Sequence, residues 1–176
     1  LNSWDVEYYL NLWKNNYIDL NNINQYFNLN KTIQNIILIY EEKFGIKFKL
    51  NNNMYDVFNK NNSFLGSLKI EVNSNISGSF NFNDEQKYTI IYINNNKKNL
   101  KIDKKNNLFC NFGLFITNLF GDLNYKKNNR IKNIVYYIFD NIFWNFDIIK
   151  QISFSEEKNK KLSDELLNKI INMKYI

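Results

Sequence analysis

The spacing of apolar residues changes twice along this chain, and that change constrains its fold more than any other feature. Apolar residues recur every three to four positions up to Phe44, every second position from Ile46 to Ile93, and every three to four positions again after Asp103. A period near 3.6 indicates helices, and a period of two indicates strands. The order predicts an α+β fold that is mainly helical with one small sheet.

The first segment, residues 1–45, predicts a pair of helices. In the first helix, aromatic and apolar residues follow Ser3, which is a suitable N-cap. The second helix runs from Leu29 to Phe44 and ends at Gly45, because glycine is the usual residue just past a helix C-terminus.

The middle segment, residues 46–95, predicts the sheet. Alternating apolar residues occur at 46–50, 65–72 and 88–93, and Asn, Ser and Gly separate these runs. We expect three to five short antiparallel strands between the second and third helices.

The last segment, residues 103–176, predicts three further helices. A buried helix runs from Asp103 to a stop at Gly121, and a second helix covers Ile131 to Ile152. The third is an amphipathic segment from Leu162 to Met173, with Ser163 near its start. A chain of 176 residues has room for one hydrophobic core. We therefore expect residues 1–176 to form a single domain.

The chain carries a formal charge of +6, and several of its lysines occur in clusters. Arg130 is the single arginine, so sequence-specific reading of nucleic-acid bases is not expected. Non-specific contact with RNA phosphates is one interpretation of the clusters, and solvated loops are the other. The residues concerned are Lys97, Lys98, Lys104, Lys105, Lys126, Lys127 and Arg130.

Cys110 is the only cysteine, and the chain has no histidine. An internal disulfide and a four-cysteine zinc site are therefore excluded. The longest uncharged stretch, residues 106–121, contains several Asn and is too short for an ordinary membrane span, so we expect a buried helix there. No cofactor and no membrane span are expected.

Several short segments, taken in order, resemble the thimet oligopeptidase and mitochondrial intermediate peptidase family. They include Trp4-Asp5, Tyr26-Phe27, Phe44-Gly45-Ile46 and the Leu-Gly strand at 64–71. The stretch from Asn107 to Leu114, which reads Asn-Leu-Phe-Cys-Asn-Phe-Gly-Leu, is similar in framework to the family segment Asn-Leu-Phe-His-Glu-Phe/Met-Gly-His.

The resemblance implies a zinc metallopeptidase fold whose reactive residues are missing here. In the family motif, two histidines four positions apart bind Zn²⁺ and the glutamate after the first acts as general base. Cys110, Leu114 and Asn111 stand at these positions, and Asn133 aligns with the glutamate that is the third ligand. We therefore expect neither zinc nor catalysis: Cys110 is interpreted as a small buried hydrophobic residue, and both asparagines as structural.

The resemblance covers only the middle of the family's catalytic region. Its N-terminal helical lobe and its downstream His-Tyr segment have no counterpart in residues 1–176. By this resemblance we expect a degenerate fragment of the catalytic domain, with half of a substrate cleft.

These features favour a non-catalytic pseudopeptidase that serves as a structural subunit of a large mitochondrial assembly. The mitochondrial location follows from the resemblance alone, and the basic charge makes the mitochondrial ribosome the first choice. The alternatives are an accessory subunit of a respiratory-chain complex and a free peptide-binding adaptor. A remote alternative is that the chain forms one part of an active zinc peptidase whose zinc ligands come from a different chain or a differently aligned segment.

Overall fold

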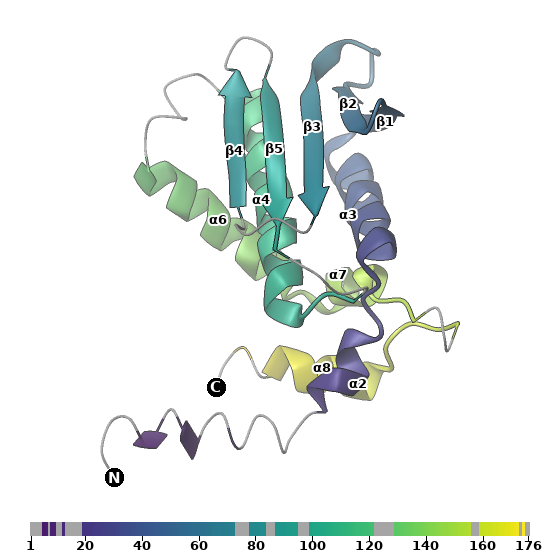
Figure 1. The fold of residues 1–176 in the computed structure, drawn as a ribbon, viewed down its shortest axis with the longest axis vertical. Helices are drawn as coiled ribbons and strands as arrows, with labels where there is room; N and C mark the ends of the chain where they lie inside the picture. The colour runs from purple at the N-terminus through teal and green to yellow at the C-terminus, as the bar shows by residue number, and fades with distance from the viewer. Residues whose placement is uncertain are drawn as a thin grey trace.

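A computed structural model gives the fold of the chain (Figure 1). It describes residues 5–6, 8–9, 12, 19–72, 78–83, 87–94, 99–121, 129–155, 159–172 and 174. The first predicted helix lies largely outside these residues.

The architecture is α+β, mainly helical with one small sheet, as the apolar spacing predicts. The sheet has five strands in the order β1-β2-β3-β5-β4. The strands are β1 (Lys47–Asn51), β2 (Met54–Phe58), β3 (Phe64–Val72), β4 (Gly78–Asn83) and β5 (Tyr88–Ile93).

The prediction of a wholly antiparallel sheet is wrong for one pair of strands, because β3 and β5 run parallel. After β3 the chain forms β4 at the sheet edge and then returns as β5 between β3 and β4. Three consecutive residues of β5, Thr89, Ile90 and Ile91, are buried. A continuous buried run suits a central strand, so β5 takes the interior place and lies beside β3 in parallel.

Local backbone chemistry sets the turn between β1 and β2. Asn52 and Asn53 both have positive φ angles, 46° and 64°. A two-residue hairpin turn of this kind matches the twist of the flanking strands, and asparagine tolerates the left-handed conformation better than most residues.

Helix α3 (Leu29–Phe44) confirms the second predicted helix. The Asn28 side chain accepts hydrogen bonds from the backbone of Asn30 and Lys31, which caps the first turn. At the other end Gly45 adopts a left-handed conformation with φ 62°. The short helix α2 (Leu20–Asn24) precedes it.

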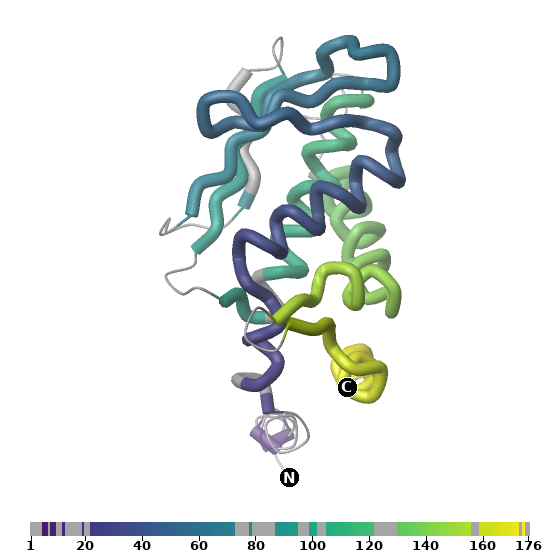
Figure 2. Tube along the Cα trace, turned by 90° about the vertical axis from the view of Figure 1, so that its right-hand side faces the viewer, coloured from purple at the N-terminus to yellow at the C-terminus, as the bar shows by residue number. Residues whose placement is uncertain are grey.

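Helix α4 (Ile102–Phe120) lies behind the sheet, and α6 (Asn129–Phe143) packs alongside it (Figures 1 and 2). The single helix predicted from Ile131 to Ile152 is in fact two, because the chain leaves the helix near Trp144 and begins α7 (Phe146–Ile152). The Asn145 side chain accepts a hydrogen bond from the backbone of Asp147 at 2.9 Å, so it caps the second helix.

Helix α8 (Asp164–Asn172) follows Ser163, as predicted. Two backbone hydrogen bonds join distant parts of the chain below the sheet: Leu100 donates to Phe27, and Phe154 donates to Tyr26. One hydrophobic core draws buried residues from all three predicted segments.

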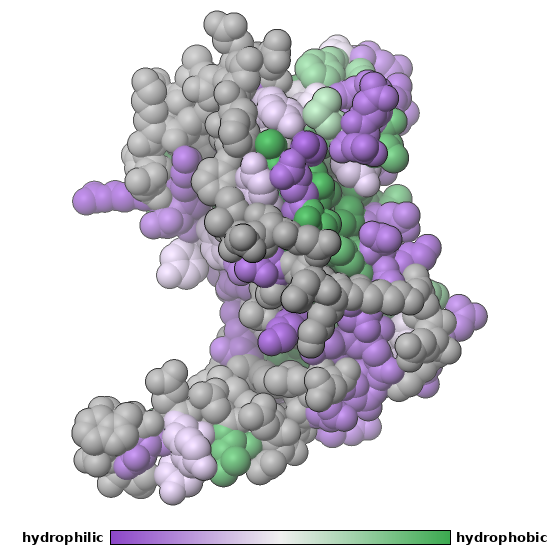
Figure 3. All heavy atoms as spheres, viewed as in Figure 1, coloured by the Kyte–Doolittle hydropathy of each residue, from purple (hydrophilic) through white to green (hydrophobic). Residues whose placement is uncertain are grey.

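Helix α4 covers one face of the sheet and α6 packs against α4, whereas the opposite face of the sheet is turned toward the viewer in Figures 1 and 3. On that face apolar and hydrophilic side chains lie intermixed over β3 and β5. Within the described part of the chain, no helix combines the length and the apolar character needed to cross a membrane.

Candidate functional site

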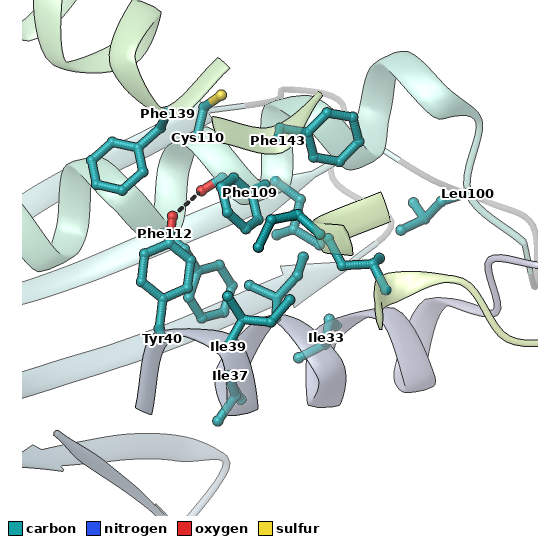
Figure 4. Packing of buried hydrophobic residues seen from close by; sticks show 14 of the residues in the cluster. Ile33, Ile37, Ile39, Tyr40, Leu100, Phe109, Cys110, Phe112, Phe139 and Phe143 are labelled. Carbon is teal, nitrogen blue, oxygen red and sulfur yellow. Dashed lines mark hydrogen bonds between the residues drawn. The ribbon is translucent and has the colours of Figure 1, made fainter. Parts of the chain in front are cut away.

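The helix with the resembling motif, α4, is fixed on one side by aromatic packing against α3. The Tyr40 ring lies 5.2 Å from the Phe109 ring and 5.8 Å from the Phe112 ring, centroid to centroid. Its hydroxyl donates to the Phe109 carbonyl at 2.9 Å (Figure 4). Burial raises the pKa of Tyr40 well above its ordinary value, and the nearby Cys110 raises it further. This phenol is therefore a buried structural donor.

On its other side α4 approaches α6 closely, because Gly113 has no side chain. A Cβ atom at this position would lie 2.2 Å from Cγ of the Phe139 ring. The glycine of the resembling motif therefore serves helix packing here, and it holds the two helices at a fixed separation.

Cys110 lies between these two contacts and belongs to a polar network. Its side chain is 0% exposed, and the thiol donates to Oδ1 of Asn106 at 3.2 Å. Nδ2 of Asn106 in turn donates to Asp140 of α6 at 2.5 Å. Asp140 also pairs with the ammonium group of Lys174 at 3.2 Å. Figure 4 shows the Cys110 sulfur pointing away from Tyr40.

The surroundings keep the Cys110 thiol protonated. Burial is the main cause that raises its pKa to about 12, and the negative charge of Asp140 adds to the rise. The nearby Tyr136 hydroxyl and the positive charge of Lys174 act in the opposite direction. Burial and Cys110 also raise the pKa of Tyr136 to about 12. At neutral pH both groups are neutral, and a protonated thiol is a poor nucleophile.

The four positions matched to the metallopeptidase motif lie in different surroundings. Cys110 and Asn111 are buried, Leu114 is half-buried and Asn133 is exposed on α6. Among the described residues, no three His, Cys, Asp or Glu side chains lie close enough together to hold a metal ion.

Sequence reasoning did not find the partners of Cys110 on α6. Tyr136 and Asp140 are four positions apart and therefore lie on one face of that helix. This spacing shows that the two residues share a face of α6. It does not show that this face meets Cys110, because that requires knowing that α6 packs against α4. Lys174, beyond α8, carries no local signal.

The interpretation that the clustered lysines contact RNA is wrong for Lys105. Lys105 is 0% exposed, and its Nζ lies 3.0 Å from the centroid of the Phe27 ring. It stands one turn before Leu108 and Phe109 on the buried side of α4, so it cannot reach a phosphate in this conformation. Arg130 is exposed. Lys97, Lys98, Lys126, Lys127 and the side chain of Lys104 lie outside the described residues.

The outward side of α6 carries a row of exposed large apolar side chains, which we call the α6 stripe. Ile134 is 58% exposed and Tyr137 is 68% exposed. At its C-terminal end the stripe meets a groove of about 610 Å³ between α3, α6 and α7, lined by Lys43, Ile142 and Asp147 among others. The stripe consists of Ile131, Ile134, Tyr137, Ile138 and Ile142.

Comparison with curated proteins finds no match to this chain. The sequence profile of Peptidase family M3, by contrast, matches residues 1–176, the whole of the chain. That match agrees with the metallopeptidase-like framework around Gly113 and with the resemblance of the 107–114 segment. The chain therefore belongs to Peptidase family M3.

Proposed function

We propose that this chain is a non-catalytic member of its family that acts as a structural subunit of a large mitochondrial assembly, with the mitochondrial ribosome as the first choice. The observation that carries the proposal is the state of Cys110. This residue stands where the family motif has its first zinc-binding histidine, and it is a buried thiol with a pKa of about 12.

The residues at the motif positions do not fit a zinc ion. A cysteine binds zinc as a thiolate, whereas the thiol of Cys110 is held protonated and bonded to Asn106. Leu114 has no donor atom, and the amide of Asn111 has no pKa that would serve proton transfer. This donor set supports no catalytic step through a metal.

The α6 stripe supports a binding role. A helix that is apolar on both of its sides is normally buried on both. Phe139 and Phe143 on the inward side of α6 are buried, whereas Ile134 and Ile138 on the outward side are exposed. Exposed apolar patches of this kind mark sites of contact with other proteins.

The choice of assembly rests on charge and on family resemblance. A formal charge of +6 suits a neighbour of ribosomal RNA, and Arg130 is placed at the surface. A mitochondrial location is inferred from the resemblance to the mitochondrial intermediate peptidase. A respiratory-chain complex is the second candidate, favoured by the apolar stripe, which fits a protein neighbour rather than RNA.

The test is the native size of the endogenous tagged protein after gentle lysis of mitochondria, measured on a sucrose gradient with and without ribonuclease. We expect migration with ribosomal particles that ribonuclease disrupts. Migration with a ribonuclease-resistant complex would move the assignment to a respiratory subunit. A small free species would contradict the proposal and favour a peptide-binding adaptor.

A second measurement addresses the catalytic alternative. Native mass spectrometry of the purified protein with added zinc should show no stoichiometric metal, and peptide cleavage should be absent. Introducing Cys110→His, Asn111→Glu, Leu114→His and Asn133→Glu together should not produce peptidase activity. Chelator-sensitive cleavage by the wild-type protein would overturn the non-catalytic assignment.

A further inference from the structure

Among the described strands, β1 stands at one edge of the sheet. The strand order is β1-β2-β3-β5-β4, and β1 lies next to the end of α3 (Figure 1). An edge strand presents backbone N–H and C=O groups that can pair with a strand of another chain. The groups that β1 directs outward therefore decide whether a second copy of this chain can extend the sheet.

The pairing with β2 determines which residues of β1 direct their backbone groups outward. A two-residue turn joins the two strands, so Asn51 and Met54 form a hydrogen-bonded pair beside it. Hydrogen-bonded and non-hydrogen-bonded pairs alternate along an antiparallel ladder. Phe48 and Leu50 are therefore non-hydrogen-bonded positions relative to β2. Their N–H and C=O groups point away from β2, toward the edge of the sheet.

A carboxylate of α3 occupies the first of these outward positions. Oε1 of Glu41 accepts a hydrogen bond from the Phe48 N–H at 2.8 Å. Glu41 stands in the last turn of α3, and the left-handed Gly45 turns the chain so that β1 begins beside this turn. A strand that paired with Phe48 would use the same N–H, so it would have to displace the carboxylate.

Two lysines add a smaller, electrostatic barrier on one face of β1. Lys47 and Lys49 are both exposed, and they share a face because they are two positions apart. If two copies of β1 paired antiparallel with Phe48 opposite Phe48, Lys47 of each copy would face Lys49 of the other, and like charges in this position destabilise pairing. Asp56 of β2 lies opposite Lys49 and offsets part of its charge. The bond from Phe48 to Glu41 is therefore the main obstacle.

We propose that Glu41 closes this edge of the sheet, because its hydrogen bond to Phe48 keeps a second copy of the chain from adding at β1. The part of Glu41 that matters is the acceptor oxygen, which occupies the N–H, rather than the negative charge. This inference goes beyond the proposed structural role and does not depend on it, since it concerns contacts of this chain with itself.

The test compares the self-association of purified variants of the full chain by sedimentation velocity. Glu41→Ala removes the acceptor and should lower the dissociation constant for self-association about tenfold or more, because two N–H groups per dimer become available for pairing. Glu41→Gln keeps an acceptor oxygen and should behave as the wild-type protein. Glu42→Ala is the matched control, because Glu42 is the neighbouring exposed glutamate and pairs with Lys43 at the surface.

A second substitution places the association on this edge. In the Glu41→Ala background, Leu50→Pro removes another outward N–H without breaking the ladder to β2, so self-association should return to the wild-type level. Circular dichroism checks that each variant is folded. Glu41→Met keeps the bulk of the side chain without the carboxylate oxygens, and it replaces Glu41→Ala if that variant does not fold.

Amide hydrogen exchange in the wild-type protein tests the contact without any substitution. The Phe48 amide should exchange about tenfold or more slowly than the Leu50 amide, although both point to the edge. Equal exchange at the two amides would overturn the inference. So would a folded Glu41→Ala protein that associates no more than the wild type, since the lysines alone would then close the edge. Association by Glu41→Gln as strong as that of Glu41→Ala, or association that Leu50→Pro does not reverse, would also contradict it.

Discussion

The two sides of α6 have similar composition and opposite surroundings. Inward, Phe139 and Phe143 are buried against α4 and its neighbours, and Phe139 meets the gap left by Gly113. Outward, Ile134 and Tyr137 are more than half exposed. Hydrophobic character alone therefore does not locate a core residue. The inward side is used within this chain, whereas the outward side is available to another molecule.

A second difference lies within the inward side itself. Its apolar residues fill the space between α4 and α6, while its polar residues, Tyr136 and Asp140, surround the thiol of Cys110. The framework of the metallopeptidase motif thus persists as helix packing. Of the four positions matched to the reactive residues of the motif, Cys110 belongs to this hydrogen-bonded network.

The largest effect is expected from truncation on the inward side. Phe143→Ala should destabilise the fold by about 3 to 5 kcal/mol, because it leaves a cavity beside Phe109. Urea unfolding followed by circular dichroism measures this change. A loss below about 1 kcal/mol would mean that the two sides of α6 do not differ as described.

The next effect concerns the close approach of the helices. Gly113→Ala should destabilise by about 1 to 3 kcal/mol, because the added Cβ meets the Phe139 ring. In an exposed helix the same substitution stabilises by about 1 kcal/mol, so the sign of the effect is diagnostic. The penalty should shrink in a Phe139→Leu background, which a double-mutant cycle measures.

A third effect follows from the raised pKa of Cys110. Its thiol titrates near 9.0 in the unfolded chain and near 12 in the fold, so the stabilisation from the protonated thiol is complete below pH 9 and is lost between pH 9 and 12. From pH 9 to 10 the wild-type protein should lose about 1 kcal/mol more stability than Cys110→Ala. If the free energy of unfolding changed with pH equally in the two proteins, the conclusion that the Cys110 thiol is buried and protonated would be wrong.

The smallest effect is expected on the outward side. Ile138→Asp should change stability by no more than about 0.5 kcal/mol, since the residue is already exposed in the folded chain. Urea unfolding of this variant and of Leu50→Asp should give the same result. A large loss for Ile138→Asp alone would show that the α6 stripe is part of the core.

Much of the fold could be predicted from local patterns. The boundaries of α3 follow from Asn28 and Gly45, which satisfy backbone groups at its two ends. The parallel pairing of β3 with β5 could not be predicted, because strand order depends on contacts between distant segments. The break at Trp144 also escaped prediction, since an apolar run alone does not reveal a capping bond such as that of Asn145.

In the candidate site, too, some residues could be found from the sequence and others only from the tertiary structure. The sequence singled out Cys110, Asn111, Leu114 and Asn133 by resemblance to the family, and the family relationship itself is confirmed. Tyr136, Asp140 and Lys174 could not be found in this way, because they reach Cys110 only across the contacts between α4, α6 and the residues beyond α8.

By itself, then, the sequence determined the class of fold, most element boundaries and the family relationship, because these depend on residue type and local spacing. The tertiary structure alone decided which side of α6 is exposed, that Lys105 lies against Phe27, and that the Cys110 thiol stays protonated. Burial and charge at a given atom are sums over neighbours from distant parts of the chain, and only the folded arrangement brings those neighbours together.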